Sequence, residues 1–433
     1  MRNRVFIIFL LIAFHVSGQK VLSLEQAIAE GLKTHFQVQL AKNDSLSDRA
    51  MSSAGSAGFL PVLMLNAGAS KASNNIRQEF SNGLTVNRNG VGSDAFNSGL
   101  ALNWTLFDGM RMFVTREKMA EIRSMGTLKV RMAMEQAVLE ITESYYALVR
   151  EMALKDALTK IMPLYEERVN IATTREEIGN GTRNDVLLAR IDLIEQRTAL
   201  MRQDVLIESA LNRLKQVMGI PQEEARNIEA VEVPDMSAFE SVLLKTEQKK
   251  PVNAGLELMQ KQVNLSHYTL LEARAQRYPQ LGLQVNYNFN NVQNQAGFAL
   301  LNRNLGLNAG LNLSWAVFDG FSAKRNIAVA GFAENAARIA LKQEQQMQEM
   351  SLRNARLQLK QALEIFKLEQ EAVSLSKEHV NIMTEKFRLG QCTGIELREA
   401  QNTLISATQR SLSASYDAAI AAAAVRRYTG SGR

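Results

Sequence analysis

The chain has 433 residues, of which 22% are charged and 46% are hydrophobic, and its formal net charge is +6 at pH 7. Its single cysteine excludes a disulfide scaffold and a cysteine-rich metal site, and the modest charge contains no basic run that would suggest a nucleic-acid partner. Only six prolines occur over this length, which favours long helices.

Residues 1–18 are predicted to be a signal peptide. Arg2 and Arg4 precede an apolar run at 5–14, and small residues follow at 16–18. The protein is therefore expected to be exported. Cys392 lies far from the expected cleavage site, so we expect no lipid anchor on the mature N-terminus. The rest of the sequence has no apolar stretch long enough for a transmembrane helix.

The remaining sequence repeats itself with an offset of 211 residues. Seven of the eleven residues at 99–109 are identical to those at 310–320, and the register holds without a gap as far as Ala189 and Ala400. A match over this length indicates that one structural unit was copied whole. We therefore predict a first repeat at 19–218, a second repeat at 251–433, and an equatorial segment at 219–250 between them.

Two strands are predicted in each repeat, at about 61–71 and 96–107 and at about 279–290 and 305–318. Apolar residues alternate there with Asn, Gln, Ser and Gly, which is the pattern of a half-buried strand. A soluble sandwich gives the same alternation, but an uncharged polar face and strands of this length favour a membrane barrel. The segments 71–95 and 291–304 are expected to be exposed loops.

Two tryptophans, Trp104 and Trp315, lie at equivalent strand ends. We predict that they are membrane-interface aromatics, with an ordinary place in the core as the alternative. Four strands cannot close a barrel, and an open sheet edge is not tolerated in hydrocarbon. Copies of the chain must therefore share a barrel, and the sequence alone permits either a dimer with eight strands or a trimer with twelve.

Long helices are predicted to fill most of the remaining sequence, at about 24–58, 110–178, 182–217, 252–277, 321–389 and 394–428. The runs at 110–178 and 321–389 would each span roughly 100 Å as helices. Their apolar residues recur at steps of three and four, which indicates coiled-coil packing. Gly179 and Gly390 end these runs, and Thr182 and Thr393 are placed to cap the returning helices.

Over its whole mature length the chain resembles the TolC-like outer membrane efflux protein family. The resemblance rests on the paired Trp-x-x-Phe-Asp-Gly segments at 104–109 and 315–320 and on the Gly-x-x-Thr turns at 179–182 and 390–393. It implies an α+β membrane protein, a homotrimer with a twelve-stranded barrel in outer-membrane lipid and a periplasmic α-barrel that closes like an iris. It also implies a periplasmic adaptor and an inner-membrane pump, either RND-type or ABC-type, as partners.

The resemblance implies that the hairpin turns dock the adaptor, which assigns Gly179, Thr182, Gly390 and Thr393 to the docking tips. Ordinary turn chemistry explains the same four residues without any partner, because glycine suits a positive φ angle and threonine suits a helix cap. The residues beside them, at 180–181 and 391–392, are polar or small where the family often has larger apolar residues.

The resemblance also implies an acidic aperture just after the second turn. Glu396 and Glu399 match the two acidic positions, and their i, i+3 spacing places both on one face of a helix. Asp185 is the first-repeat counterpart of Glu396. Rings of carboxylates around a closed pore would concentrate cations. The alternative is a solvated acidic face, which is common on long helices.

We therefore predict a passive exit duct of a tripartite efflux pump that exports small molecules or ions. The exit duct of a type I protein secretion system is an alternative with the same fold, and a non-conducting coiled-coil surface protein is an alternative of another class. The sequence has no nucleophile elbow, phosphate loop, dinucleotide fingerprint or zinc-ligand spacing. No enzymatic activity, catalytic residue, metal or cofactor is therefore predicted.

Overall fold

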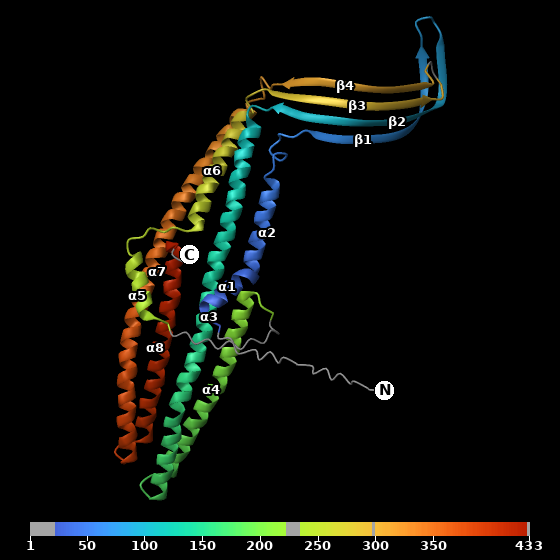
Figure 1. Ribbon diagram of the computed structural model, residues 1–433. Helices are drawn as coiled ribbons and strands as arrows, with labels where there is room; N and C mark the ends of the chain where they lie inside the picture. Colours follow the sequence, from blue (N-terminus) through green and yellow to red (C-terminus); the bar gives the residue numbers. More distant parts are fainter. Residues whose placement is uncertain (1–21, 222–233, 297–298, 431–433) are drawn as a thin grey trace, which may run out of the picture. The chain divides into compact units, whose positions relative to one another are not determined.

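The computed structural model describes residues 22–221, 234–296 and 299–430 (Figure 1). The predicted signal peptide and part of the predicted equatorial segment lie outside these ranges. The chain divides into two compact units. We call Lys42–Lys129 with Ala254–Gln345 the strand unit, and the described parts of Met1–Ala41, Val130–Asn253 and Gln346–Arg433 the hairpin unit.

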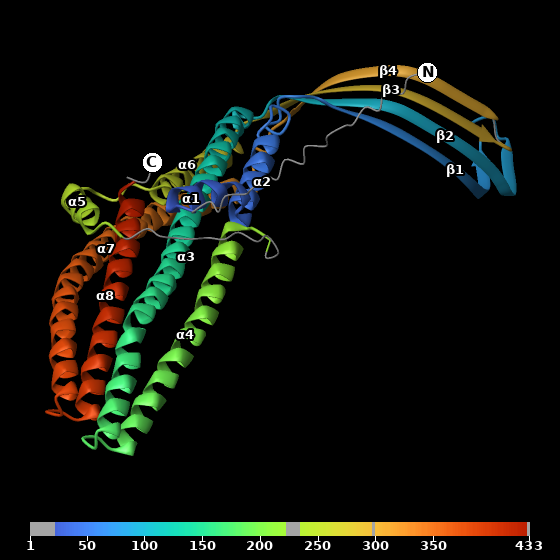
Figure 2. The ribbon, with the colours of Figure 1, turned by 60° about the horizontal axis from the view of Figure 1, so that its bottom comes forward.

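The strand unit contains one antiparallel sheet in the order β1-β2-β3-β4 (Figures 1 and 2). Its strands are β1 (Val62–Glu79), β2 (Thr85–Phe107), β3 (Gln280–Asn294) and β4 (Leu301–Ser314). Within the described residues, β1 and β4 each pair with a strand on one side only. The sheet therefore ends in two free edges.

The strands continue beyond the predicted ends, so the prediction of loops at 71–95 and 291–304 was wrong. β1 runs on to Glu79, β2 begins at Thr85, and the β3–β4 pairing extends to Gln293 and Leu301. Both faces of these outer strand segments are largely polar, so the alternation that marks a strand in the sequence is lost there. The backbone hydrogen bonds that hold the sheet together do not depend on that alternation.

Each repeat has the same corner between its last strand and its long helix. Asp108 Oδ1 accepts a hydrogen bond from the Met112 amide at 3.0 Å, and Asp319 Oδ1 accepts one from the Ser322 amide at 3.0 Å. In each corner the next two residues have positive φ angles, and the second of them is not glycine in either repeat. The helices that follow are α3 (Arg111–Glu177) and α7 (Ser322–Arg388).

The strand unit also contains α6 (Ala254–Ala275), most of α2 (Phe36–Met51) and the first parts of α3 and α7. A small apolar core of Leu270, Ala273 and Ala330 joins α6 to α7. The predicted single helix at 24–58 is instead two helices, α1 (Leu24–Thr34) and α2. The helix breaks at His35, which has an extended ψ of 121° and is buried beside Glu140 at 3.5 Å.

The hairpin unit consists of α1, α4 (Arg183–Met218), α5 (Met236–Thr246), α8 (Gly394–Thr429) and the remainder of α3 and α7. Short turns join α3 to α4 and α7 to α8 (Figure 2). α3 and α7 each have 67 residues, α4 and α8 each have 36, and the matching ends differ by 211 residues. Element lengths therefore repeat as well as sequence.

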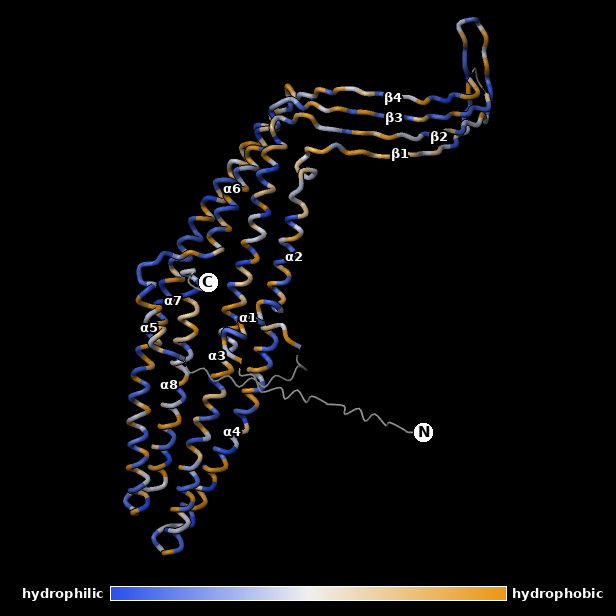
Figure 3. The backbone as a smooth tube through the Cα atoms, viewed as in Figure 1, coloured by the Kyte–Doolittle hydropathy of each residue, from blue (hydrophilic) through white to orange (hydrophobic). Residues whose placement is uncertain are grey.

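The largest apolar core lies in the hairpin unit. Tyr145 and Leu148 of α3, Leu359 of α7 and Tyr416 of α8 are all buried in it. Hydrophobic and hydrophilic residues interleave along the helices (Figure 3). Among the described residues, no helix combines the length and the hydropathy that crossing a membrane requires.

Candidate functional site

One face of the sheet carries amide and small side chains. Strand register places Asn97, Asn290 and Asn304 in one row across β2, β3 and β4. Asn66 and Asn288 help to line a hollow of about 380 Å³ on this face. At positions 62–72, 95–105, 280–292 and 302–314 the residues of this face include no charged side chain. The face can contact water without attracting ions of either sign.

The opposite face of the sheet is apolar and open. Leu65, Leu100, Tyr287 and Leu307 form one row across the four strands. Their exposed fractions are 72%, 43%, 46% and 70%. An apolar face of this kind is stable only against lipid or another apolar surface. The sheet thus has the two faces of a barrel wall, one polar and one apolar.

The two predicted interface tryptophans make equivalent contacts. Trp104 Nε1 donates a hydrogen bond to the Phe59 carbonyl at 3.0 Å, and Trp315 Nε1 donates one to the Arg277 carbonyl at 3.1 Å. Each carbonyl lies two residues before the proline that precedes a strand. The side chains stay 39% and 59% exposed, so neither tryptophan is a buried core residue in this chain. Each indole has a satisfied N–H and an open apolar ring.

The predicted docking residues form two matching turns in the hairpin unit. Gly179 and Gly390 are exposed and have φ angles of 78° and 74°, which strongly favour glycine. Thr182 and Thr393 are the N-cap residues of α4 and α8. Each threonine hydroxyl accepts the amide of the third helical residue, and the carboxylate of that residue accepts the threonine amide, which is a capping box.

The three predicted aperture acids differ in what they bind. Asp185 and Glu396 are the acids of the two capping boxes. The Glu396 carboxylate accepts the Thr393 amide at 2.7 Å and its hydroxyl at 2.9 Å. These hydrogen bonds lower the pKa of Glu396. Glu399 is exposed, and its carboxylate has no hydrogen bond or ion pair with any residue in the described part of the chain.

The structure does not bring these three acids into direct contact. No hydrogen bond connects one of them to another within the described ranges. The same ranges contain no group of three or more His, Cys, Asp or Glu side chains able to hold a metal ion. As a source of an unpaired charge after the second turn, Glu399 is therefore the strongest of the three candidates.

Contacts that were not predicted from the sequence connect the two hairpins close to their turns. Arg175 at the end of α3 donates from Nη1 to the Phe387 carbonyl of α7 at 3.0 Å. Its guanidinium also lies over the Phe387 ring, 4.9 Å from the centroid. Arg388 of α7 forms an ion pair with Glu167 of α3 at 2.6 Å. These contacts join the end of α3 to the end of α7.

A buried polar network between α3, α4 and α8 was also not predicted from the sequence. Arg168 Nη1 lies 2.8 Å from Asp192 Oδ2, and these side chains are only 3% and 8% exposed. Gln401 is fully buried and donates from Nε2 to the Leu164 carbonyl at 3.2 Å. Burial lowers the pKa of Arg168, and the neighbouring Asp192 carboxylate opposes that shift.

Comparison with known proteins agrees with this architecture. The family model described as outer membrane efflux protein matches residues 27–220 and 253–431. The chain is similar to the outer-membrane channel OprN, with a TM-score of 0.76 and 17% identity over 94% of this chain and 90% of that chain. No sequence among curated proteins matches it.

Two further solved structures are similar to the chain over 94% of its length. CusC, which forms a transmembrane channel, has a TM-score of 0.74 and 15% identity and is covered over 91% of its chain. The CmeC outer membrane channel of Campylobacter jejuni has a TM-score of 0.74 and 16% identity and is covered over 86% of its chain. Four strands combined with two long helical hairpins are a TolC-like fold.

Proposed function

Because the chain belongs to the outer membrane efflux protein family, it is an outer-membrane efflux channel and not an enzyme, and we propose that it is the passive exit duct of a tripartite pump for small molecules or ions. The observation that carries this proposal is the two-faced sheet. Its uncharged amide face suits a water-filled passage, and its exposed apolar face suits lipid. Trp104 and Trp315 then lie at the membrane interface.

Three copies of the chain are proposed to share one pore. Four strands are too few to close a barrel, and the free edges of β1 and β4 would remain unpaired in lipid. Pairing β1 of one copy with β4 of the next closes a ring of twelve strands. Such a contact is head-to-tail, so the two surfaces that meet are different.

Two exposed apolar stripes in the hairpin unit support the same assembly. The α4 stripe consists of Leu187, Ile191, Ile194, Met201 and Val205, with exposed fractions from 46% to 71%. The α7 stripe consists of Leu368, Leu375 and Ile382 together with Leu389, which directly follows α7; the four are spaced seven residues apart and are 48% to 69% exposed. Both follow coiled-coil spacing, and within the described residues no helix covers them. We assign them to the contact between neighbouring copies.

The helical hairpins are proposed to extend into the periplasm. Their turns, with Gly179, Thr182, Gly390 and Thr393 exposed, are the proposed docking surface for a periplasmic adaptor. Through the adaptor, the channel would serve an inner-membrane pump of RND-type or ABC-type. Export through a cleaved signal peptide, without a lipid anchor, belongs to the same proposal.

The proposed aperture depends on Glu399 rather than on all three acids. In a trimer, three unpaired Glu399 carboxylates would repel one another and attract cations. Glu396 stays ionised, but it contributes less, because Thr393 holds its carboxylate at the partly positive N-terminus of α8.

Planar-bilayer recording of the purified full-length protein tests this function. We expect small cation-selective openings, a marked loss of selectivity in Glu399→Gln, and a weaker loss in Glu396→Gln. Glu349→Gln removes an exposed carboxylate from α7, far along the chain from Glu399 of α8, and is the matched control. Absence of any conductance would contradict the duct. Conductance whose selectivity ignores Glu399→Gln would contradict the aperture alone.

A further inference from the structure

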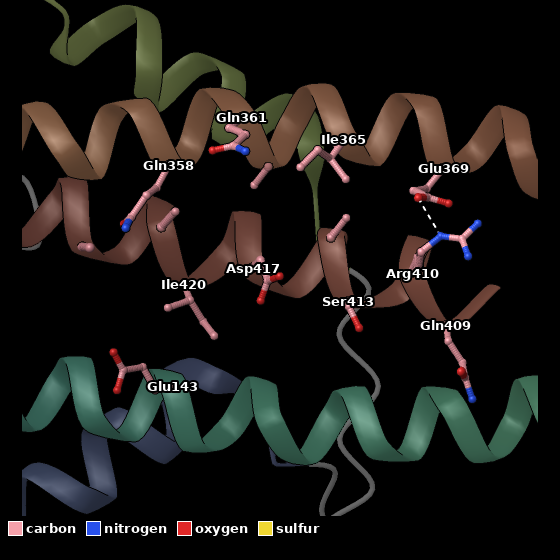
Figure 4. A pocket seen from close by; sticks show the side chains of 14 residues that line it. Glu143, Gln358, Gln361, Ile365, Glu369, Gln409, Arg410, Ser413, Asp417 and Ile420 are labelled. Atoms are coloured by element: carbon pink, nitrogen blue, oxygen red, sulfur yellow. Dashed lines mark hydrogen bonds and ion pairs between the residues drawn. The ribbon is translucent and has the colours of Figure 1, made fainter. Parts of the chain in front are cut away.

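A groove of about 810 Å³ lies within the hairpin unit (Figure 4). Its walls come from α3 on one side and from α7 and α8 on the other. Glu143 extends into it from α3, while Asp417 and Ile420 line it from α8. This volume is within the range of sites that hold small organic molecules, about 300–1,000 Å³.

The floor of the groove is apolar and is formed by small residues. Ala362 of α7 and Ala414 and Ala421 of α8 are buried at its base. Ile365 and Ile420 flank this base and are partly exposed. Alanines at three base positions leave room that larger side chains would fill. The groove therefore offers apolar contact area to a molecule that enters it.

The charge of the groove is negative. Its lining includes the carboxylates of Glu143, Glu369 and Asp417 but only one cation, Arg410. Arg410 Nε donates to Glu369 Oε1 at 2.8 Å, so that pair is neutral overall. Glu143 and Asp417 form no ion pair with any residue in the described ranges. Two carboxylates without an ion pair thus face a space with an apolar floor.

The surroundings of Glu143 destabilise its negative charge while the carboxylate has no ion-pair partner. Burial raises its pKa, the nearby Glu140 carboxylate raises it further, and Arg427 opposes both effects. A carboxylate that has lost part of its hydration gains more from a cation than a fully solvated one does. This observation adds to the geometry and favours a positively charged occupant.

We propose that this groove binds organic cations that carry an apolar body. The two free carboxylates select the positive charge, and the alanine floor takes up the alkyl or aromatic part. An organic anion is disfavoured because Arg410, the one arginine among the residues that line the groove, is already paired with Glu369. A small inorganic cation would leave the apolar floor unused. The proposal concerns equilibrium binding and does not depend on the route of export.

A pair of ions with the same shape and opposite charge tests the proposal. Tetraphenylphosphonium and tetraphenylborate are offered separately, by equilibrium dialysis, to the assembled full-length protein in lipid nanodiscs, with empty nanodiscs subtracted. We expect saturable binding of the phosphonium, one per chain, and no saturable binding of the borate. Equal binding of the two ions, or no binding of the phosphonium because a neighbouring copy fills the groove, overturns the proposal.

Two single substitutions locate the site. Glu143→Gln and Asp417→Asn are each expected to weaken phosphonium binding about tenfold, as for the loss of one charge-assisted contact. Both side chains are exposed in the chain, so the fold should tolerate the change. Glu349→Gln, outside the groove, should bind as the wild type does. Unchanged affinity in both groove variants overturns the proposal, and bilayer conductance measured in parallel shows whether the duct itself survives.

Discussion

Asp192 of α4 and Arg168 of α3 form the most deeply buried ion pair that the structure shows in the described part of the helical hairpins. Asp192 Oδ1 also lies 3.9 Å from Arg398 Nη1 of α8, and Gln401 Oε1 accepts a hydrogen bond from Arg168 Nη1 at 3.4 Å. Taking charges out of water is costly, and their mutual attraction offsets that cost only while both partners are present. The pair therefore holds α3, α4 and α8 in one arrangement. Replacing only one of its two residues should strongly destabilise the fold.

We predict that Asp192→Asn lowers the free energy of unfolding of the helical hairpins by about 3–5 kcal/mol, because Arg168 keeps its charge in a buried site. The double variant Arg168→Met with Asp192→Leu should recover most of that loss, since it removes both charges. Thermal unfolding followed by circular dichroism measures the difference. A double variant as unstable as the single one would show that packing, not charge, is responsible.

The position of Asp192 in the sequence indicates burial, but a charged residue type is normally taken to indicate exposure. Asp192 lies three residues after Ala189 and six after Val186, so it shares their buried face of α4. Charged residues on a long helix are expected to be solvated, and only the tertiary partner Arg168 reverses that expectation. The hairpin turns were easier, because glycine at a positive φ angle and threonine before an acid three residues on are local patterns.

Thr393 and Glu396 make a pH-dependent cap on α8. The pKa of Glu396 is lowered from 4.5, so the carboxylate form that closes the capping box is fully present above that pH. Its contribution is lost as the pH falls through the lower folded-state pKa. Stability of the first turn of α8 should therefore decline on acidification below about pH 4.5.

We predict that Thr393→Val destabilises this first turn by about 1 kcal/mol at neutral pH, because the valine offers no oxygen to the Glu396 amide. Hydrogen exchange of the α8 amides, followed by mass spectrometry at pH 7 and at acidic pH, measures the effect. Thr403→Val is the control, since its hydroxyl bonds only within the helix to the Glu399 carbonyl. A variant that differs from wild type equally at both pH values would argue against the carboxylate's role.

Secondary-structure elements differ in how far the sequence predicts them. α3 spans Arg111–Glu177 where the sequence predicts a helix at 110–178, because glycines end the runs and heptad spacing persists throughout. The predicted β1 ended too early. Residues such as Lys71 and Asn74 show no apolar alternation, although the hydrogen-bonded pairing of β1 with β2 continues through them. The break at His35 was missed because no glycine or proline marks it.

At the scale of a helix, the exposed α4 and α7 stripes yield a test of assembly. Met201→Glu on α4 or Leu375→Glu on α7 places a charge in a contact that we assign to neighbouring copies. We predict that either change converts the oligomer to single chains, because a buried unpaired carboxylate is strongly unfavourable there. Size-exclusion chromatography with light scattering measures the mass.

Conservative changes at the same two positions separate contact from folding. Met201→Leu and Leu375→Met keep the apolar surface and should leave the oligomer intact. Circular dichroism of all four variants should show unchanged helix content, since the side chains of Met201 and Leu375 are 71% and 60% exposed in the single chain. An oligomer that survives both glutamate variants would remove the stripes from the interface.

For the whole molecule, the two repeats distribute charge unequally. The amide face of the sheet is uncharged at positions 62–72, 95–105, 280–292 and 302–314, so this part of the wall should not discriminate between ions of opposite sign. At the two positions that match Glu396 and Glu399, the first hairpin has only one acid, Asp185, and its carboxylate is held in a cap, while the other position is Leu188. The second offers Glu399 with no partner in the described ranges. Selectivity should therefore come from one carboxylate per chain, repeated by assembly.

We predict that channels assembled from a mixture of wild-type and Glu399→Gln chains fall into four classes of cation selectivity. Three chains around one pore supply three, two, one or no Glu399 carboxylates, and each lost charge weakens the local attraction for cations. Reversal potentials of single channels in a salt gradient measure the classes. A mixture of wild type with Glu349→Gln should give one class only. Three classes would indicate two chains per pore, and two classes would indicate that copies do not share a pore at all.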